Sequence, residues 1–226
     1  MKSCLLPHIV FGMVALLLGF ASIAQAGPPL ICHPIEIGQA KSLPWVEWNR
    51  KGNGGYDLKN LSRDTLAILN SSTPVLVRME TLRRATLYAR QDPQVAKELL
   101  TRLHLRASNS DAAGHPEALA WFDVGYLVET YKQWMGAHEP NPASGLDGYA
   151  CVKKALSLRP ADPEMEFAAA LITLLGPQSE RREHLQRAMA GAENDPLLAR
   201  NLASSFNGQT VAAMLSVDRP AARPRE

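Results

Sequence analysis

Histidine is the residue type in this chain that could bind a metal or act as a base, but the histidines are scattered. Beyond the N-terminal apolar segment they are His33, His104, His115, His138 and His184. Zinc ligands usually occur in closely spaced pairs, and the sequence has no His-Glu-x-x-His segment. Haem attachment requires two cysteines before a histidine, whereas only Cys32 precedes His33. We therefore expect no metal and no cofactor.

Nucleophiles and acid pairs are also missing from the positions where catalysis needs them. Residues 51–55 are rich in glycine, but a phosphate-binding loop requires its lysine to be followed by Ser or Thr at a helix start. No Gly-x-Ser-x-Gly or Ser-x-x-Lys segment occurs, so no nucleophile is indicated. Glu164 and Glu166 are two residues apart and would point to different faces of a helix. The sequence therefore predicts no catalytic residue and favours a binding protein over an enzyme.

Arginines cluster between residues 74 and 91, as Arg78, Arg83, Arg84 and Arg90. They could form a phosphate site, but a solvated helix face explains them more simply, and that is what we expect. The whole chain has a formal net charge of +2. Nucleic-acid binding requires a clustered basic face, so we expect no nucleic-acid partner.

Helices over most of the chain would position these residues. Aspartate followed by proline occurs at Asp92-Pro93, Asp162-Pro163 and Asp195-Pro196. The carboxylate of aspartate accepts hydrogen bonds from first-turn amides, and proline is favoured next because it lacks an N–H group. With apolar residues at helical spacing, these starts predict helices at 62–70, 74–91, 93–107, 116–136, 146–158, 163–175, 179–191 and 196–206.

The segment 116–206 resembles the tetratricopeptide repeat. The residues spaced like the two helices of that repeat are Trp121, Val124, Gly125, Lys154, Ala155, Leu156, Leu158 and Pro160. Ala188 and Pro196 follow Ala155 and Pro163 at one common interval. The sequence departs from the family pattern in the extra residues 136–144 and in Glu166, which stands where the family has tryptophan.

The resemblance implies an all-α fold, a right-handed stack of antiparallel helix pairs (a tetratricopeptide-like α-solenoid). In this family the first helix of each pair lines a concave groove that holds peptides or partner segments. Carried over by position, the groove residues would be Leu119, Phe122, Tyr126, Glu129 and Thr130, with Phe167 and Leu171 in the next unit. The groove is either open to a partner or covered by the N-terminal arm or the next helix, and the sequence leaves both open.

The chain divides into four expected segments. Residues 1–26 have the features of a secretory signal peptide: Lys2, an apolar run, and Ala24-Gln25-Ala26 as a cleavage pattern. We therefore expect a periplasmic or secreted protein that begins at Gly27 and has no later membrane span. Residues 27–55 are rich in proline and glycine and predict an irregular N-terminal arm. Residues 56–206 would form the helical-repeat domain, and 207–226 a partly disordered tail.

Cys32 and Cys151 are the two cysteines of the expected mature chain. In an oxidising compartment two cysteines commonly pair, and a disulfide would tie the arm to the helix at 146–158. The alternative is two separately buried thiols. We expect the disulfide.

Two functions are compatible with these patterns. The first is an exported interaction scaffold that binds a protein or peptide partner in the concave groove. The second is an enzyme or small-ligand binder with a site between the aromatic arm and the helices, near Trp45, Trp48 and Tyr56. The repeat pattern and the lack of a catalytic motif favour the first.

Overall fold

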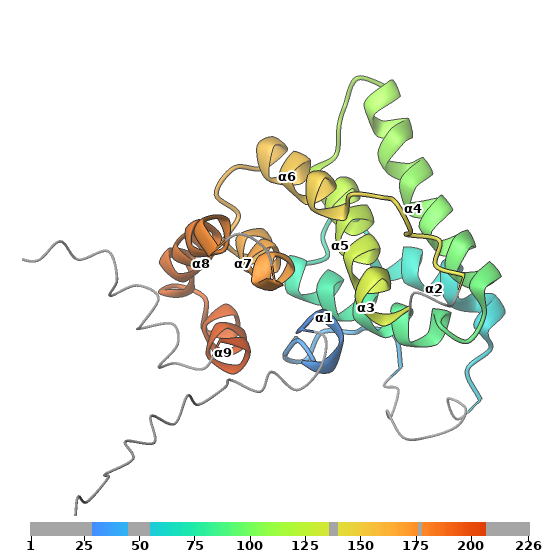
Figure 1. Cartoon of the computed structure of the whole chain (residues 1–226), viewed down its shortest axis with the longest axis horizontal. Coiled ribbons are helices and arrows are strands. Elements are labelled where there is room, and N and C mark those ends of the chain that lie inside the picture. Colours follow the sequence, from blue (N-terminus) through green and yellow to red (C-terminus); the bar gives the residue numbers. More distant parts are fainter. Residues whose placement is uncertain (1–28, 45–54, 136–139, 176–177, 207–226) are drawn as a thin grey trace, which may run out of the picture.

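The structure is a computed structural model that describes residues 29–44, 55–135, 140–175 and 178–206 (Figure 1). Within these ranges the chain forms nine α-helices, two short 3₁₀ helices and no strand, so the all-α class is confirmed. The α-helices are α1 (Pro29–Cys32), α2 (Leu61–Ile68), α3 (Val75–Ala89), α4 (Pro93–Ala112), α5 (Ala118–Trp134), α6 (Gly148–Leu158), α7 (Pro163–Ile172), α8 (Gln178–Ala192) and α9 (Pro196–Ser205). The 3₁₀ helices are η1 (Leu58–Asn60) and η2 (Thr173–Leu175).

The three predicted Asp-Pro helix starts are confirmed. Asp92 caps α4, Asp162 caps α7 and Asp195 caps α9, each by accepting hydrogen bonds from first-turn amides. The Asp162 carboxylate, for example, lies 3.0 Å from the backbone nitrogen of Met165. Asp147 caps α6 in the same way without a following proline. These caps fix where four of the helices begin.

Helix α3 begins without a cap of its own, because Pro74 precedes it. Its exposed first-turn amide is satisfied from elsewhere in the chain: Glu164 of α7 accepts a hydrogen bond from the backbone nitrogen of Leu76 at 3.0 Å. A carboxylate at a helix N-terminus also interacts favourably with the helix dipole. This contact joins α7 to α3, so the C-terminal helices are attached to the N-terminal half.

Helices α5 and α6 pack closely, and so do α7 and α8 (Figure 1). The backbones of α5 and α6 approach where two glycines face each other. A methyl group on Gly125 would lie 2.5 Å from the carbonyl oxygen of Gly148, and one on Gly148 would lie as close to that of Gly125. At the second pair, a methyl group on Gly191 would lie 2.2 Å from the Cβ of Pro163. Packed helix pairs of this kind are compatible with a helical-repeat fold.

The N-terminal arm is part of the hydrophobic core. Residues 27–55 were predicted to be irregular, but the arm contains the helical turn α1, which contacts α3, α5 and α7. The large apolar side chains of the arm that are buried are Leu30, Ile31, Ile35 and Leu43. In Figure 1 the arm (blue) lies between α9 and α3. The arm therefore bridges the two ends of the helical body.

The predicted solvated basic face on α3 is wrong for Arg78 and Arg83, whereas Arg90 at the end of the helix is exposed. Arg78 is fully buried and forms an ion pair of 2.6 Å with Asp123 of α5, which is also fully buried. Arg78 also donates to the carbonyl oxygen of Thr73 at 3.0 Å. Arg83 is buried as well. Helix α3 is covered on almost all sides, and a charged side chain can be buried there only if it is paired.

The predicted disulfide is not formed. Cys32 and Cys151 are free thiols, both half-buried, and they do not lie at bridging distance. Burial raises the pKa of both thiols. Cys32 lies in α1 and Cys151 in α6, and the arm is held by contacts other than a disulfide.

Several expectations concern residues outside the described ranges. These are the signal peptide at 1–26, the tryptophans Trp45 and Trp48, and the tail at 207–226. Among the described residues, no helix combines the length and the apolar character that a membrane span needs.

We expect Gly125→Ala to destabilise the protein by about 1–3 kcal/mol, because the added methyl group meets backbone atoms of α6 that cannot move independently. At a helix position without close neighbours, the same change would raise the free energy of unfolding by up to about 1 kcal/mol. The free energy of unfolding from urea denaturation distinguishes the two signs. Thr101→Ala on the exposed side of α4 is the control and should change this free energy by less than about 0.5 kcal/mol.

The Arg78–Asp123 pair predicts a pH dependence. Burial raises the pKa of Asp123 to about 6, and the charge of Arg78 offsets this only in part. The contribution of Asp123 to stability is therefore fully present below about pH 4 and is lost as the pH rises through about 6. We expect Asp123→Asn to lower the free energy of unfolding by roughly 2–3 kcal/mol more at pH 4 than at pH 7. Urea denaturation at both pH values measures this difference. An equal cost at the two pH values would contradict the assignment.

Candidate functional site: an occupied helical face and an acid–base cleft

The predicted groove residues lie mostly in the protein interior. The fully or almost fully buried members are Phe122, Tyr126, Thr130, Phe167 and Leu171. Phe122 and Tyr126 stack on each other with ring centroids 5.7 Å apart, and Phe167 meets Phe206 edge to face. The sequence left open whether the predicted groove is open to a partner or covered by other parts of the chain. The burial of these side chains agrees with a covered groove. These side chains offer no apolar surface to a partner while the arm is in place.

Leu119 and Glu129, and also the buried Thr130, contact other parts of the structure. Leu119 is half-buried at the edge of the core. Glu129 accepts hydrogen bonds from the backbone nitrogen of Tyr149 and from Lys132, so it faces α6. The hydroxyl of Thr130 lies 2.8 Å from that of Thr86 and faces α3. Glu129 and Thr130, which were predicted to share one helix face, therefore contact two different helices, α6 and α3.

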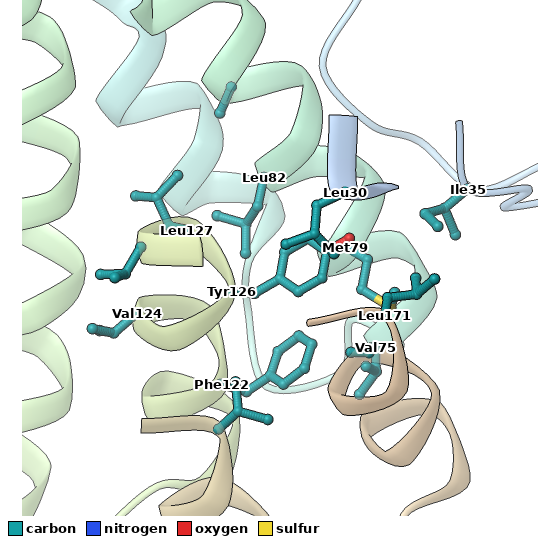
Figure 2. Close-up of a cluster of buried hydrophobic side chains, with 14 of the residues drawn as sticks. Leu30, Ile35, Val75, Met79, Leu82, Phe122, Val124, Tyr126, Leu127 and Leu171 are labelled. Carbon is teal, nitrogen blue, oxygen red and sulfur yellow. The ribbon is translucent and has the colours of Figure 1, made fainter. Parts of the chain in front are cut away.

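The arm covers a surface that we call the arm face, made of the sides of α3, α5, α7 and α9 that residues 29–44 contact. Figure 2 shows Leu30 of α1 next to Tyr126 of α5 and Met79 of α3, with Leu171 of α7 nearby. Leu30 and Ile35 belong to the same buried cluster as these residues. The apolar side chains of the arm thus pack against Tyr126 and Leu171, two of the residues predicted to line a groove.

Buried charges of α3 hold the main chain of the arm. The carboxylate of Glu80, which is fully buried, accepts a hydrogen bond from the backbone nitrogen of Ile35 at 3.0 Å. The same carboxylate pairs with Arg83 and Arg84, each at 2.7 Å. Arg83 in turn donates to the carbonyl oxygen of Ile31 at 2.9 Å. One buried ionic cluster therefore binds both an N–H and a C=O group of the arm.

Two amide side chains complete this binding. Asn201 of α9 accepts a hydrogen bond from the backbone nitrogen of Glu36 at 2.8 Å and donates to its carbonyl oxygen at 2.9 Å. Gln133 of α5 accepts from the backbone nitrogen of Leu30 at 2.9 Å. Arg200 forms an ion pair with the Glu36 side chain at 2.9 Å. Side chains of three helices thus recognise the backbone of an irregular segment.

A second feature that could bind a ligand or support a reaction is the α6–α8 cleft, which has a volume of about 590 Å³. Helix α6 supplies one wall with Tyr149 and Lys153, and helix α8 supplies the opposite wall. The turn between α6 and α7 forms its edge. There Ala161 has a φ of 59°, and it is the one non-glycine residue with positive φ in the described ranges. Such backbone strain concentrates at functional sites.

Three side chains form a hydrogen-bonded chain at this cleft. Glu166 of α7 is buried and pairs with Nδ1 of His184 on α8. Nε2 of His184 lies 2.7 Å from the hydroxyl oxygen of Tyr149. A carboxylate only accepts hydrogen bonds, so Nδ1 of His184 carries the hydrogen of its contact with Glu166. The chain runs from a buried carboxylate to a hydroxyl at the cleft wall.

Charges around Tyr149 keep its hydroxyl protonated. Burial raises the pKa of Tyr149, and a hydrogen bond to Glu180 and the charges of Glu180, Glu166 and Glu183 raise it further. The ammonium nitrogen of Lys153 lies over the Tyr149 ring, 4.6 Å from its centroid. Arg187 reaches Glu166 at 3.4 Å from the same side. The cleft therefore surrounds a protonated tyrosine hydroxyl with charges of both signs, of which the carboxylates are the more numerous.

A third cleft, also of about 590 Å³, lies between α4 and the connection from α5 to α6. Pro140 and Pro142, which belong to the residues in excess of the repeat pattern, form one wall. The exposed Leu105 and Leu146 lie at this cleft. It is an apolar surface with no assigned occupant.

The sequence also predicted a site between the arm and the helices, near Trp45, Trp48 and Tyr56. Of these three residues, the structure describes Tyr56 alone. Its ring packs against Tyr88 at 4.6 Å, and its hydroxyl donates to Asp64 at 2.9 Å. The clefts described above lie elsewhere. Within the described ranges, no group of three or more His, Cys, Asp or Glu side chains is arranged to hold a metal ion.

Sequence reasoning missed the residues that bind the arm and form the cleft. Glu80 precedes Arg83 and Arg84 at helical spacing inside an apolar helix, and this pattern could have indicated a buried cluster. Glu166 was noticed as a departure from the family pattern, but nothing local connects it to His184. Nothing in the local sequence connects Asn201 to Glu36, which lies 165 residues away. Comparison of the chain with protein-family models, curated proteins and solved structures gives no match.

We expect Asn201→Ala to loosen the arm without unfolding the body. It removes two hydrogen bonds to the main chain of Glu36, which together are worth about 1–3 kcal/mol. The amide of Glu36 should then exchange its hydrogen about ten- to a hundred-fold faster, measured by NMR or mass spectrometry. Ser204→Ala is the matched control, because that hydroxyl donates within α9 only. Unchanged exchange at Glu36 in Asn201→Ala would show that the amide does not hold the arm.

Proposed function

We propose that this protein is an exported interaction scaffold whose helical body binds an extended segment of a protein partner on the arm face. The N-terminal residues 29–44 act as an internal ligand of that face. The resemblance to tetratricopeptide repeats between 116 and 206 supports the assignment, as does the signal-peptide pattern of residues 1–26. Partner binding then replaces the arm.

The observation that carries this proposal is the way in which the arm is bound. Side chains of Glu80, Arg83, Gln133 and Asn201 satisfy backbone N–H and C=O groups of a segment that is largely irregular. Backbone groups are the same in every peptide, so this set of contacts suits any extended segment. Selectivity comes from the side chains that fill the apolar positions of the face.

The apolar positions define what a partner segment must supply. Leu30, Ile31, Ile35 and Leu43 are each at most 5% exposed. Burial of a large aliphatic side chain contributes about 1.5–3 kcal/mol. A segment that replaces the arm must offer similar aliphatic anchors, and an acidic residue at the position of Glu36 would pair with Arg200. The proposed partner is therefore an aliphatic segment with little net charge.

The proposal can be tested by separating the arm from the body after folding. A site-specific protease sequence inserted between Asn53 and Gly54 allows the folded chain to be cut there. We expect the cut protein to exchange its arm for a fluorescent peptide of residues 27–44 in a saturable way, followed by fluorescence anisotropy. Unlabelled peptide should compete for binding.

A peptide in which Ile35 is replaced by Asp is the matched control, because it keeps the length but places a charge in the buried cluster. It should fail to compete. If the arm fragment leaves the cut protein only at denaturant concentrations that also unfold the helices, the arm is a fixed part of the core and the proposed function is wrong.

A further inference from the structure

We propose that Tyr126 is the residue by which the arm face distinguishes a partner segment from the arm. The partner carries an uncharged hydrogen-bond acceptor, such as an asparagine side chain, at the position where the arm has Leu30. This inference rests on the proposed function and refines it at one position of the segment. The other apolar positions, which Ile31, Ile35 and Leu43 fill in the arm, keep their aliphatic requirement.

The hydroxyl group of Tyr126 is buried without a hydrogen-bond partner. Tyr126 is 0% exposed, and no atom of the described residues forms a hydrogen bond with its hydroxyl oxygen. A buried polar group without a partner costs free energy, so such groups are rare in proteins. Tyr131 on the same helix shows the usual case, because its hydroxyl donates to the carbonyl oxygen of Ala96 at 3.3 Å. The unpaired hydroxyl of Tyr126 is therefore an exception that points to a missing group.

This hydroxyl lies where the arm meets the body. Helix α1 contacts α5, and Figure 2 shows the hydroxyl oxygen of Tyr126 next to the side chain of Leu30. A leucine side chain offers it carbon atoms alone. The polar groups nearby do find partners on the arm: Gln133 accepts from the backbone nitrogen of Leu30, and Arg83 donates to the carbonyl oxygen of Ile31. The arm therefore satisfies Gln133 and Arg83 but not Tyr126.

The surroundings of the hydroxyl limit the chemistry that can pair with it. Burial raises the pKa of Tyr126, the charge of Glu80 raises it further, and the charge of Arg83 offsets this in part. The hydroxyl therefore stays protonated and can donate. A carboxylate at the position of Leu30 would be buried beside the negative charge of Glu80, and lysine and arginine have no acceptor atom. An uncharged acceptor remains, and asparagine has nearly the shape of leucine.

An unpaired hydroxyl under the arm also gives a partner an advantage over the arm. The arm belongs to the same chain as the face that it covers, so its effective concentration there is high. A separate segment can replace it only by binding more tightly. A hydrogen bond from Tyr126 is a contribution that the arm, with Leu30, does not make.

The test is a double-mutant cycle on the cut protein described above. Leu30→Asn is placed in the fluorescent peptide of residues 27–44 and Tyr126→Phe in the body, and both changes almost keep the shape of the side chain. We expect Leu30→Asn to weaken binding at least about ten-fold more on the Tyr126→Phe body than on the unchanged body. Tyr126→Phe alone should leave the affinity for the unchanged peptide equal or higher.

Leu43→Asn in the peptide is the matched control, because it places the same amide at the other end of the described arm. It should weaken binding to the two bodies by factors that agree within about two-fold. If a variant peptide binds too weakly to measure, the same cycle is made in the intact chain. There the urea midpoint should fall less on Leu30→Asn with the tyrosine than in Tyr126→Phe.

The outcomes separate this inference from the proposed function. If the peptide exchanges with the arm but Leu30→Asn has the same effect with and without the hydroxyl, Tyr126 does not select the partner, and the inference is wrong while the proposed function stands. If no peptide exchanges with the arm at all, both are wrong.

Discussion

The buried carboxylate of Glu80 is the constraint on which the rest of the structure depends. A charged group in the interior is costly unless it is paired and fully hydrogen-bonded. Glu80 meets this condition only with two arginines from its own helix and one N–H group from the arm. Arg83 then needs the carbonyl oxygen of Ile31. The polar interior of α3 therefore requires the arm, and the arm, which has few hydrogen bonds of its own, requires α3.

The helices were predictable because their signals are local. Periodic apolar residues and the Asp-Pro caps placed every long helix within a few residues of its observed bounds, although α4 continues to Ala112 rather than ending near 107. The close approach at Gly125 also agrees with the small residue that the repeat pattern requires there. Helix α1 was not predicted, since its four residues have no periodicity and are held in place only by tertiary contacts.

The candidate sites were much less predictable, because their residues meet only in three dimensions. Phe122 and Tyr126 were expected on one face, and they are, but the sequence could not decide what covers them. The arginines of α3 looked like a solvated face because charge usually indicates exposure. Glu166, His184 and Tyr149 come from three different helices. No short motif connects them, so only the packing of α6, α7 and α8 shows that they form a chain.

The hydrogen bonds between Glu36 and Asn201 join residues 165 positions apart. A contact between residues so far apart in the sequence forms late in folding, because the entropy cost of closing so long a loop must be overcome first. During synthesis Glu36 of the arm is therefore made 165 residues before its binding partner on α9. The growing chain cannot bind its arm to α9 until both segments have left the ribosome.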